Sequence, residues 1–258
     1  MVSPIASVKV YEGVLNAPSV PTPVVESASN LGADFNTFIR EKFGRNGWDN
    51  KGSDLKLVVD YPLNGALLNN AFWDTETKAI YLGAGDGKIL GNTAFSKDVI
   101  FHEATHAIVD TEVKLPYKGQ SGAINESFAD VMAMVASNGD TKIGEDIFTP
   151  NVPGDSLRDM RTPTISHYSQ IDRADGEVHL LSGVPSLAAV KVEDAIGVDK
   201  LGKIWYTALT DKLTRNSGFS GAARATILSA QMLYGNDSKE SQAVRDAWDA
   251  VGVKPRFK

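Results

Sequence analysis

The sequence predicts an α+β protein with two lobes, a mixed, β-rich N-terminal lobe over residues 1–113 and a mainly α-helical C-terminal lobe over residues 114–258. Alternation of apolar and polar residues, which is typical of strands, is found in about the first 83 residues. Helical spacing dominates from about residue 184 onward. The length of 258 residues accommodates either one large domain or two lobes around a substantial core.

In the N-terminal lobe, residues 8–14 alternate as a half-buried strand does, and the Pro- and Ser-rich residues 17–29 are predicted to form a loop. A helix with Gly44 as its C-cap is predicted next, from apolar residues at helical spacing. These residues are Phe35, Phe38, Ile39 and Phe43. The remaining strand-like stretches are residues 55–61 and 70–83, the second a hairpin that turns near residues 75–77.

After Ser96 the period changes to that of helices, which are predicted over residues 98–113 and 123–137. Residues 140–178 are dense in Gly, Pro and Asp and are predicted to be mostly irregular. Three further helices are expected over residues 203–213, over residues 222–233, and after a capping box formed by Asp237 and Glu240.

The composition excludes several classes of protein. Lys and Arg number 26 against 32 Asp and Glu, so the net charge is 26 − 32 = −6 and a nucleic acid or an anionic membrane is not the expected partner. No apolar run is long enough to span a bilayer, and residues 1–4 do not read as a secretory signal. Because the chain has no Cys, disulfides, Cys-ligated zinc and thiol nucleophiles are all excluded.

The predicted helix over residues 98–113 contains His102-Glu103-Ala104-Thr105-His106. Two His side chains four residues apart lie on one helical face and can reach one metal ion, while the Glu beside them can hold a water. The motif alone also occurs as a solvated or buried pair. Here the flanking residues are apolar, and buried polar side chains need a partner such as a cation.

A catalytic zinc ion needs three protein ligands and an open position, but the chain has only four His. The third ligand is therefore open to a carboxylate. Glu126 and Asp130 share one face of the next predicted helix, so we expect Glu126 to bind zinc and Asp130 to accept the second N–H of a ligand His. The alternative is that both acids lie on a solvated face.

Together these residues resemble the thermolysin family of zinc metalloendopeptidases, a group of gluzincins. Nineteen residues separate His106 from Glu126, which lies in Asn125-Glu126-Ser127-Phe128-Ala129-Asp130, and further similarity runs from about residue 69 to 253. The similar segments are residues 70–73, 154–158, 175–179, 182–183, 201–206 and 247–253. The first 65 or so residues match poorly and imply a shortened N-terminal lobe. The metzincin pattern is excluded because positions 109 and 112 are Val109 and Glu112.

The resemblance implies one catalytic Zn²⁺ bound by His102, His106 and Glu126, in a cleft between the lobes. Glu103 is then the general base that acts on a zinc-activated water, and Tyr117 and His179 stabilise the oxyanion. Asn125 and Asp130 support the ligands. Substrate backbone is expected to bind Asn70, Ala71 and Arg158, and the residues at the primary specificity pocket are Val99, Ile143, Ile147 and Leu157. Since these four are aliphatic, we expect cleavage before bulky hydrophobic residues.

Some positions depart from the family pattern. The Asp that normally orients the catalytic His is replaced by Ala174, so Asp172 or Asp175 is expected to take its place, or His179 is less well held. Leu181 stands where the family has Asn. A carboxylate shared by two calcium ions is replaced by Ser137, which suits one Ca²⁺ better than two. The candidate calcium ligands are Asp98, Asp140, Glu145 and Asp155, with a solvated acidic loop as the alternative.

We therefore predict a secreted metalloendopeptidase, made as a zymogen with a propeptide and acting as a monomer on proteins or peptides, without nucleic-acid or membrane partners. Two alternatives stay open. One is a non-catalytic homologue of the same fold that binds metal or peptide, favoured by Ala174 and Leu181. The other is a structural or interaction domain that carries the His-Glu-x-x-His pattern by chance.

Overall fold

The computed structural model describes residues 4–257, which divide into two compact units. The first unit contains the described residues up to Thr111 together with Lys142–Arg158, and the second contains Glu112–Thr141 and the chain from Asp159 onward. The segment Lys142–Arg158 lies within the range of the predicted C-terminal lobe but belongs to the first unit.

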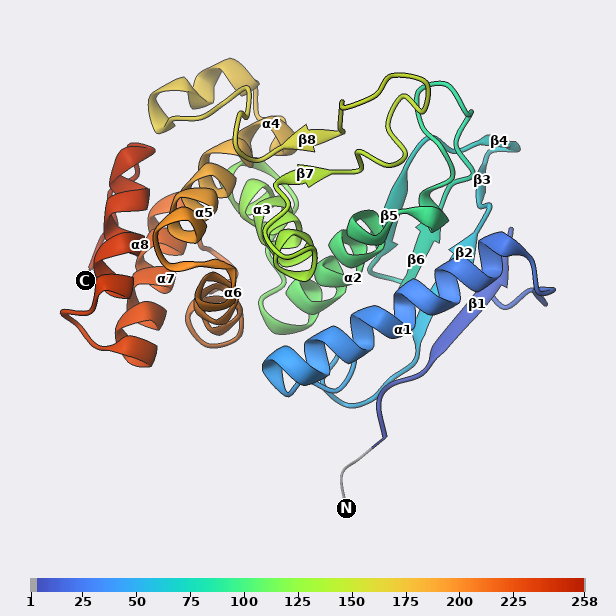
Figure 1. Cartoon of the computed structure of the whole chain (residues 1–258), viewed down its shortest axis with the longest axis horizontal. Coiled ribbons are helices and arrows are strands. Elements are labelled where there is room, and N and C mark those ends of the chain that lie inside the picture. Colours follow the sequence, from blue (N-terminus) through green and yellow to red (C-terminus); the bar gives the residue numbers. More distant parts are fainter. Residues whose placement is uncertain (1–3, 258) are drawn as a thin grey trace. The chain divides into compact units, whose positions relative to one another are not determined.

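The first unit is built on a four-stranded sheet with the order β1-β2-β6-β5 (Figure 1). Its strands are β1 (Val8–Glu12), β2 (Leu55–Val59), β6 (Ala79–Leu82) and β5 (Ala71–Asp74). β1 and β6 each pair with β2 in parallel, whereas β5 and β6 form the predicted antiparallel hairpin. β5 is therefore an edge strand with one side of its backbone unpaired within this sheet. A small ladder of β3 (Pro62–Leu63) and β4 (Ala66–Leu67) stands apart from the sheet.

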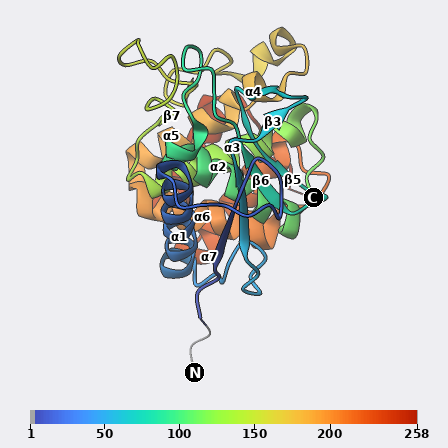
Figure 2. The same cartoon turned by 90° about the vertical axis from the view of Figure 1, so that its right-hand side faces the viewer.

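Helix α1 (Pro23–Phe43) packs against β1 and β2, as Figure 2 shows from the side. The approach is close, because a Cβ on Gly32 would lie 3.0 Å from Cγ1 of Val8. The prediction of a loop over residues 17–29 is wrong from residue 23 onward, because α1 begins there. Proline fits the first turn of a helix and Thr22 caps it by accepting the N–H of Val25, so the Pro-rich composition marks a helix start.

Helix α2 (Lys97–Glu112) follows a short 3₁₀ turn η1 (Thr93–Phe95) and carries the His-Glu-x-x-His pattern. Its buried face packs on α1 through Phe101, whose ring centroid lies 5.3 Å from that of Phe35 in an edge-to-face arrangement. From Val99 to Thr105 every residue of α2 is buried, so its polar side chains are held in an apolar setting. The unit also contains β7 (Lys142–Ile143), paired with β8 (Arg158–Asp159) at the point where the chain enters the second unit.

The second unit is a helical bundle whose buried aromatic residues are Phe128, Trp205, Phe219 and Trp248. Its helices are α3 (Gly119–Ala136), η2 (Tyr168–Ala174), α4 (Val178–Leu181), α5 (Gly183–Ile196), α6 (Val198–Thr207), the π turn η3 (Ala208–Lys212), α7 (Phe219–Tyr234) and α8 (Lys239–Ala250). The capping box expected at Asp237 and Glu240 is wrong, because Ser238 caps α8 and Glu240 instead pairs with Lys200 at 2.6 Å. Within residues 4–257, no helix combines the length and apolarity that a membrane crossing requires.

Candidate metal centre and active site

The two imidazoles of α2 lie next to each other, as their spacing predicts. The Nε2 atoms of His102 and His106 are 2.9 Å apart, and His102 is buried whereas His106 is half-buried. Two nitrogens bound to one tetrahedral zinc ion lie about 3.3 Å apart, given Zn–N bonds of about 2.0–2.1 Å. The Nε2 atoms therefore already face a common point.

Glu103 is buried beside this pair and is held by the edge strand. Its Oε2 accepts the backbone N–H of Trp73, the third residue of β5, at 3.0 Å. One carboxylate oxygen is thereby fixed by the sheet, which sets the position of the other. The sequence places Glu103 next to the metal ligands, but it gives no sign of this bond to the strand.

Glu126 lies on α3 in the second unit and is only 1% exposed. The Tyr117 hydroxyl donates a short hydrogen bond to its Oε1, and Nε2 of His179 lies 3.5 Å from its Oε2. The Tyr117 hydroxyl is also 3.3 Å from His179 Nε2. The two residues predicted to stabilise an oxyanion therefore both face the predicted metal-binding carboxylate.

His102, His106 and Glu126 form a group of potential metal ligands whose ligand atoms all lie within 4.8 Å of one another. Two imidazole nitrogens and one carboxylate oxygen are a donor set that suits Zn²⁺ and leaves a fourth position open. The residues present thus fit the predicted zinc ion.

The imidazole of His179 is oriented by a residue that the sequence analysis missed. Its Nδ1 lies 2.7 Å from Oε1 of Glu177, the N-cap residue of α4. The expectation that Asp172 or Asp175 takes this role is wrong, because Asp175 instead ends the η2 turn in a left-handed conformation. A carboxylate two residues before the His was visible in the sequence, but only the cap geometry turns it back toward the imidazole.

Burial raises the pKa of Glu177, but hydrogen bonds from the His179 side chain and from the backbone N–H groups of His179 and Leu180 outweigh this effect. The net result is a pKa below the ordinary value of Glu. Glu177 is therefore ionised at neutral pH and can only accept hydrogen bonds, so the hydrogen between the two side chains belongs to Nδ1 of His179.

The predicted substrate-binding residues of the first unit are found at the sheet edge and on β8. Ala71 opens β5, and the carbonyl of Asn70 accepts the N–H of Gly83 at 3.0 Å. A Cβ on Gly83 would lie 2.1 Å from the backbone oxygen of Leu68, so no other residue fits there. A guanidinium nitrogen of Arg158 lies 3.5 Å from Nδ1 of His102, which aims this side chain toward the metal ligands.

The four aliphatic residues predicted to line a specificity pocket all belong to the first unit. Val99, Ile143 and Ile147 are buried, and Leu157 is 37% exposed. Leu157 and Ile143 are joined by a backbone hydrogen bond of 2.9 Å. Their role in specificity stays a prediction. The same holds for Asn125 and Asp130, which are both buried on α3.

The candidate calcium ligands stay a prediction. Within residues 4–257, none of them belongs to a group of three or more potential metal ligands. Asp98 is buried, and its carboxylate accepts hydrogen bonds from the Ser96 hydroxyl and from the N–H groups of Val99 and Gly144. Asp155 accepts a short hydrogen bond from Thr149, and the two remaining candidates are exposed. These are Asp140 and Glu145.

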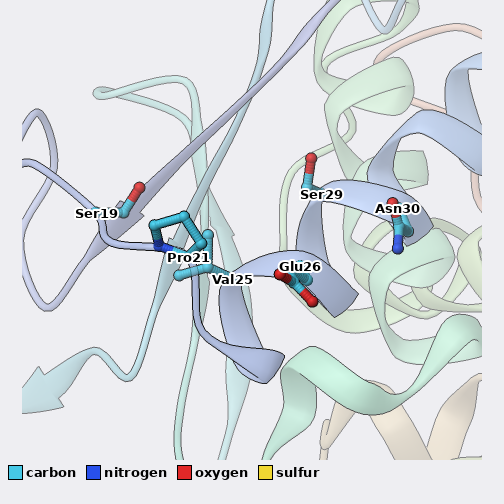
Figure 3. A pocket seen from close by; sticks show the side chains of 6 residues that line it. All are labelled: Ser19, Pro21, Val25, Glu26, Ser29 and Asn30. Atoms are coloured by element: carbon cyan, nitrogen blue, oxygen red, sulfur yellow. The ribbon is translucent and has the colours of Figure 1, made fainter.

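A separate surface pocket lies at the N-terminal end of α1 (Figure 3). Its lining residues are Ser19, Pro21, Val25, Glu26, Ser29 and Asn30. None of the predicted site residues lines this pocket, and Glu26 is its single ionisable side chain. We therefore do not consider it a candidate active site.

A helix that presents two imidazoles and a Glu between them, with a carboxylate from a following helix, is the pattern typical of zinc metallopeptidases of the gluzincin class. Comparison with known proteins agrees. Residues 19–110 match the catalytic domain of thermolysin metallopeptidases, and residues 113–253 match their alpha-helical domain. The chain therefore belongs to the thermolysin family of metallopeptidases, and the predicted α+β fold is confirmed.

Individual relatives support the same assignment. The chain is 37% identical over 234 residues to a bacillolysin of Brevibacillus brevis, covering 84% of this chain and 44% of that protein. It is 39% identical over 240 residues to the neutral protease NprE of Bacillus pumilus, covering 89% of this chain and 76% of that protein. A solved structure of the precursor of protealysin, a metalloproteinase from Serratia proteamaculans, superposes with a TM-score of 0.86 at 28% identity, covering 98% of this chain and 89% of that one. The chain spans about half the length of the bacillolysin relatives.

Proposed function

We propose that this chain is a zinc-dependent endopeptidase that hydrolyses peptide bonds on the N-terminal side of bulky hydrophobic residues. The observation that carries the proposal is the group of His102, His106 and Glu126, whose ligand atoms lie within 4.8 Å of one another in a chain of the thermolysin family. These three residues would hold the ion. Bound Zn²⁺ supplies Lewis acidity, which polarises a carbonyl and acidifies water.

Glu103 is the proposed general base. Because its Oε2 is occupied by the N–H of Trp73, its Oε1 is left to take a proton from the attacking water and to deliver it to the leaving amine. The bond to Trp73 also keeps the carboxylate from turning away from the reacting atoms. General acid–base catalysis of this kind contributes about 10²–10⁴-fold to the rate.

Tyr117 and His179 are the proposed donors to the oxyanion that forms when water attacks the carbonyl. The side chains of both residues lie against Glu126, and the Tyr117 hydroxyl is 3.3 Å from Nε2 of His179, so their polar atoms lie beside the carboxylate that is proposed to bind the ion. Donors that are already in place when charge develops lower the barrier without reorganisation.

Substrate is proposed to bind as an added strand along the edge of β5 that is unpaired within the sheet, which begins at Ala71 beside Asn70 and where the N–H of Trp73 is already bound to Glu103. Arg158 is proposed to donate to a substrate carbonyl. The preference for a bulky apolar residue after the scissile bond is supported by four aliphatic side chains of the first unit. They are Val99, Ile143, Ile147 and Leu157.

Secretion and a propeptide are proposed from relatives. One is an extracellular elastase of Staphylococcus epidermidis, 36% identical over 245 residues, and the protealysin structure is that of a precursor. A monomer without membrane or nucleic-acid partners stays a prediction from the sequence. Calcium binding also stays a prediction, and the hydrogen bonds already made by Asp98 do not favour it.

The test combines metal analysis with turnover of a quenched fluorescent peptide that carries Leu or Phe after the scissile bond. We expect near-stoichiometric zinc, hydrolysis that a chelator abolishes and zinc restores, and at least a ~10²-fold loss of kcat in Glu103→Gln with zinc retained. Glu76→Gln, the same change at an exposed position, is the control. A peptide library cleaved chiefly before Asp or Lys would contradict the specificity.

The main alternative is a non-catalytic homologue that binds metal or peptide. On this alternative the purified protein binds zinc, but the wild-type chain and Glu103→Gln hydrolyse the peptide at the same rate, which is no higher than the background. Absence of zinc from the purified protein would instead favour a structural domain.

A further inference from the structure

The carboxylate of Glu177 contacts both the side chain of His179 and the backbone that carries it. Its Oε1 lies 2.7 Å from Nδ1 of His179 and 3.1 Å from the backbone nitrogen of the same residue. Its Oε2 lies 2.7 Å from the backbone nitrogen of Leu180. One side chain thus fixes both the start of α4 and the rotation of the imidazole.

We infer that Glu177 is the positioning residue of His179, which it holds with Nε2 directed at the reacting carbonyl oxygen. This inference rests on the proposed peptidase function. With Nδ1 donating to Glu177, the other ring nitrogen faces Tyr117 at 3.3 Å and Glu126 at 3.5 Å. The imidazole can donate from Nε2 only when both ring nitrogens carry hydrogen, so the donating form is the imidazolium, whose charge the Glu177 carboxylate stabilises. A group held in this way loses little freedom when it donates to a developing charge.

His179 needs such a support because little else restrains it. Its side chain is 46% exposed, and α4 has only four residues. Ala174, where the family places the orienting carboxylate, is buried and ends in a methyl group that accepts no hydrogen bond. This chain has therefore moved the carboxylate from five residues before the His to two residues before it.

A purely structural role for Glu177 is the alternative, because an N-cap side chain stabilises a helix without any part in catalysis. Glu177→Ser separates the two roles. Serine is a preferred N-cap that accepts a backbone N–H, but its short side chain cannot reach Nδ1 of His179. The variant therefore keeps the cap and loses the contact with the imidazole.

The experiment is a double-mutant cycle on the zinc-loaded enzyme with Glu177→Ser, His179→Ala and the double variant. We expect Glu177→Ser to lower kcat about 10–100-fold with KM within about twofold, because the support acts on the transition state. In the His179→Ala background the same change is expected to alter kcat less than about twofold. Asp175→Asn, the neighbouring carboxylate without a bond to His179, is the matched control and keeps wild-type turnover.

A readout that does not need activity is the ¹⁵N resonances of the imidazoles. In the wild-type chain we expect these resonances to show a hydrogen on Nδ1 of His179. In Glu177→Ser we expect the Nδ1 resonance to lose this preference. Unchanged kcat in Glu177→Ser, or an equal loss with and without His179, overturns the inference. An inactive wild-type chain refutes the proposed function instead, while the ¹⁵N signature still reports on the contact.

Discussion

Removing the hydroxyl of Tyr117 tests how the two proposed oxyanion donors differ. Tyr117→Phe deletes one O–H group and leaves the ring in place. In the structure this hydroxyl donates its single hydrogen to Oε1 of Glu126, which is buried. To donate to a substrate oxyanion, Tyr117 must give up that bond, whereas His179 Nε2 faces the same region without an equally short partner.

The expected magnitude follows from the difference between two hydrogen bonds. Loss of an oxyanion donor costs about 2.7–4 kcal/mol of barrier. The bond to a charged carboxylate that must be broken is worth about 1.5–3 kcal/mol. The net loss expected for Tyr117→Phe is therefore about 1–2 kcal/mol, which is about a 5–30-fold fall in kcat at nearly constant KM.

The assay is steady-state hydrolysis of a quenched peptide with Leu after the scissile bond, with zinc content measured on each preparation. His179→Ala is the comparison and is expected to lose about 10²–10³-fold, more than Tyr117→Phe. A loss in Tyr117→Phe that equals or exceeds that of His179→Ala would refute the reasoning. So would a change smaller than about twofold with zinc retained.

Three further predictions concern the fold. Trp248→Phe removes the hydrogen bond of 2.8 Å to the Thr226 hydroxyl in the core, and the free energy of unfolding in urea is expected to fall by about 2–3 kcal/mol; a loss below about 0.5 kcal/mol would contradict this. Gly83→Ala is expected to cost more than about 3 kcal/mol by the same assay, because its Cβ would lie 2.1 Å from a backbone oxygen. The hydrogen bond from Arg161 lowers the pKa of Asp194 below 3.8, so their stabilisation is present above that pH and is lost as pH falls through the lowered pKa. Because both side chains are about half exposed, Asp194→Asn is expected to cost less than about 1 kcal/mol at pH 7, and the difference in stability from wild type narrows as the pH falls through the lowered pKa. A difference that does not change with pH would exclude the ion pair as its source.

The helices that carry the metal ligands could be predicted because their signals are local. The spacing of His102 and His106 fixes a shared face on any helix, and the apolar residues around them require burial. The hairpin of residues 70–83 follows from alternation and a polar turn in the same way. The start of α1 could not be predicted in this way, because Pro and Ser are typical of loops as well as of the first turn of a helix, where Thr22 and Pro23 are found.

Contacts that depend on the tertiary path of the chain could not be predicted. Nothing in the composition around Trp73 indicates that its N–H binds Glu103, thirty positions further on. Glu177 could not be singled out from the sequence, because the family pattern places the orienting carboxylate at position 174, which lies between Asp172 and Asp175. The φ of 45° at Asp175 turns the chain and leaves the next carboxylate to reach His179.

The bond between the sheet edge and Glu103 has a consequence for inhibitor design. A non-cleavable strand mimetic that pairs with β5 can bind only in registers that differ by two residues, which is about 6.6–6.8 Å along the strand. A shift of one residue would turn its side chains to the opposite face of the sheet. A metal-chelating warhead on such a scaffold should then have one optimal attachment point, and potency should fall sharply when the warhead is moved by one backbone unit.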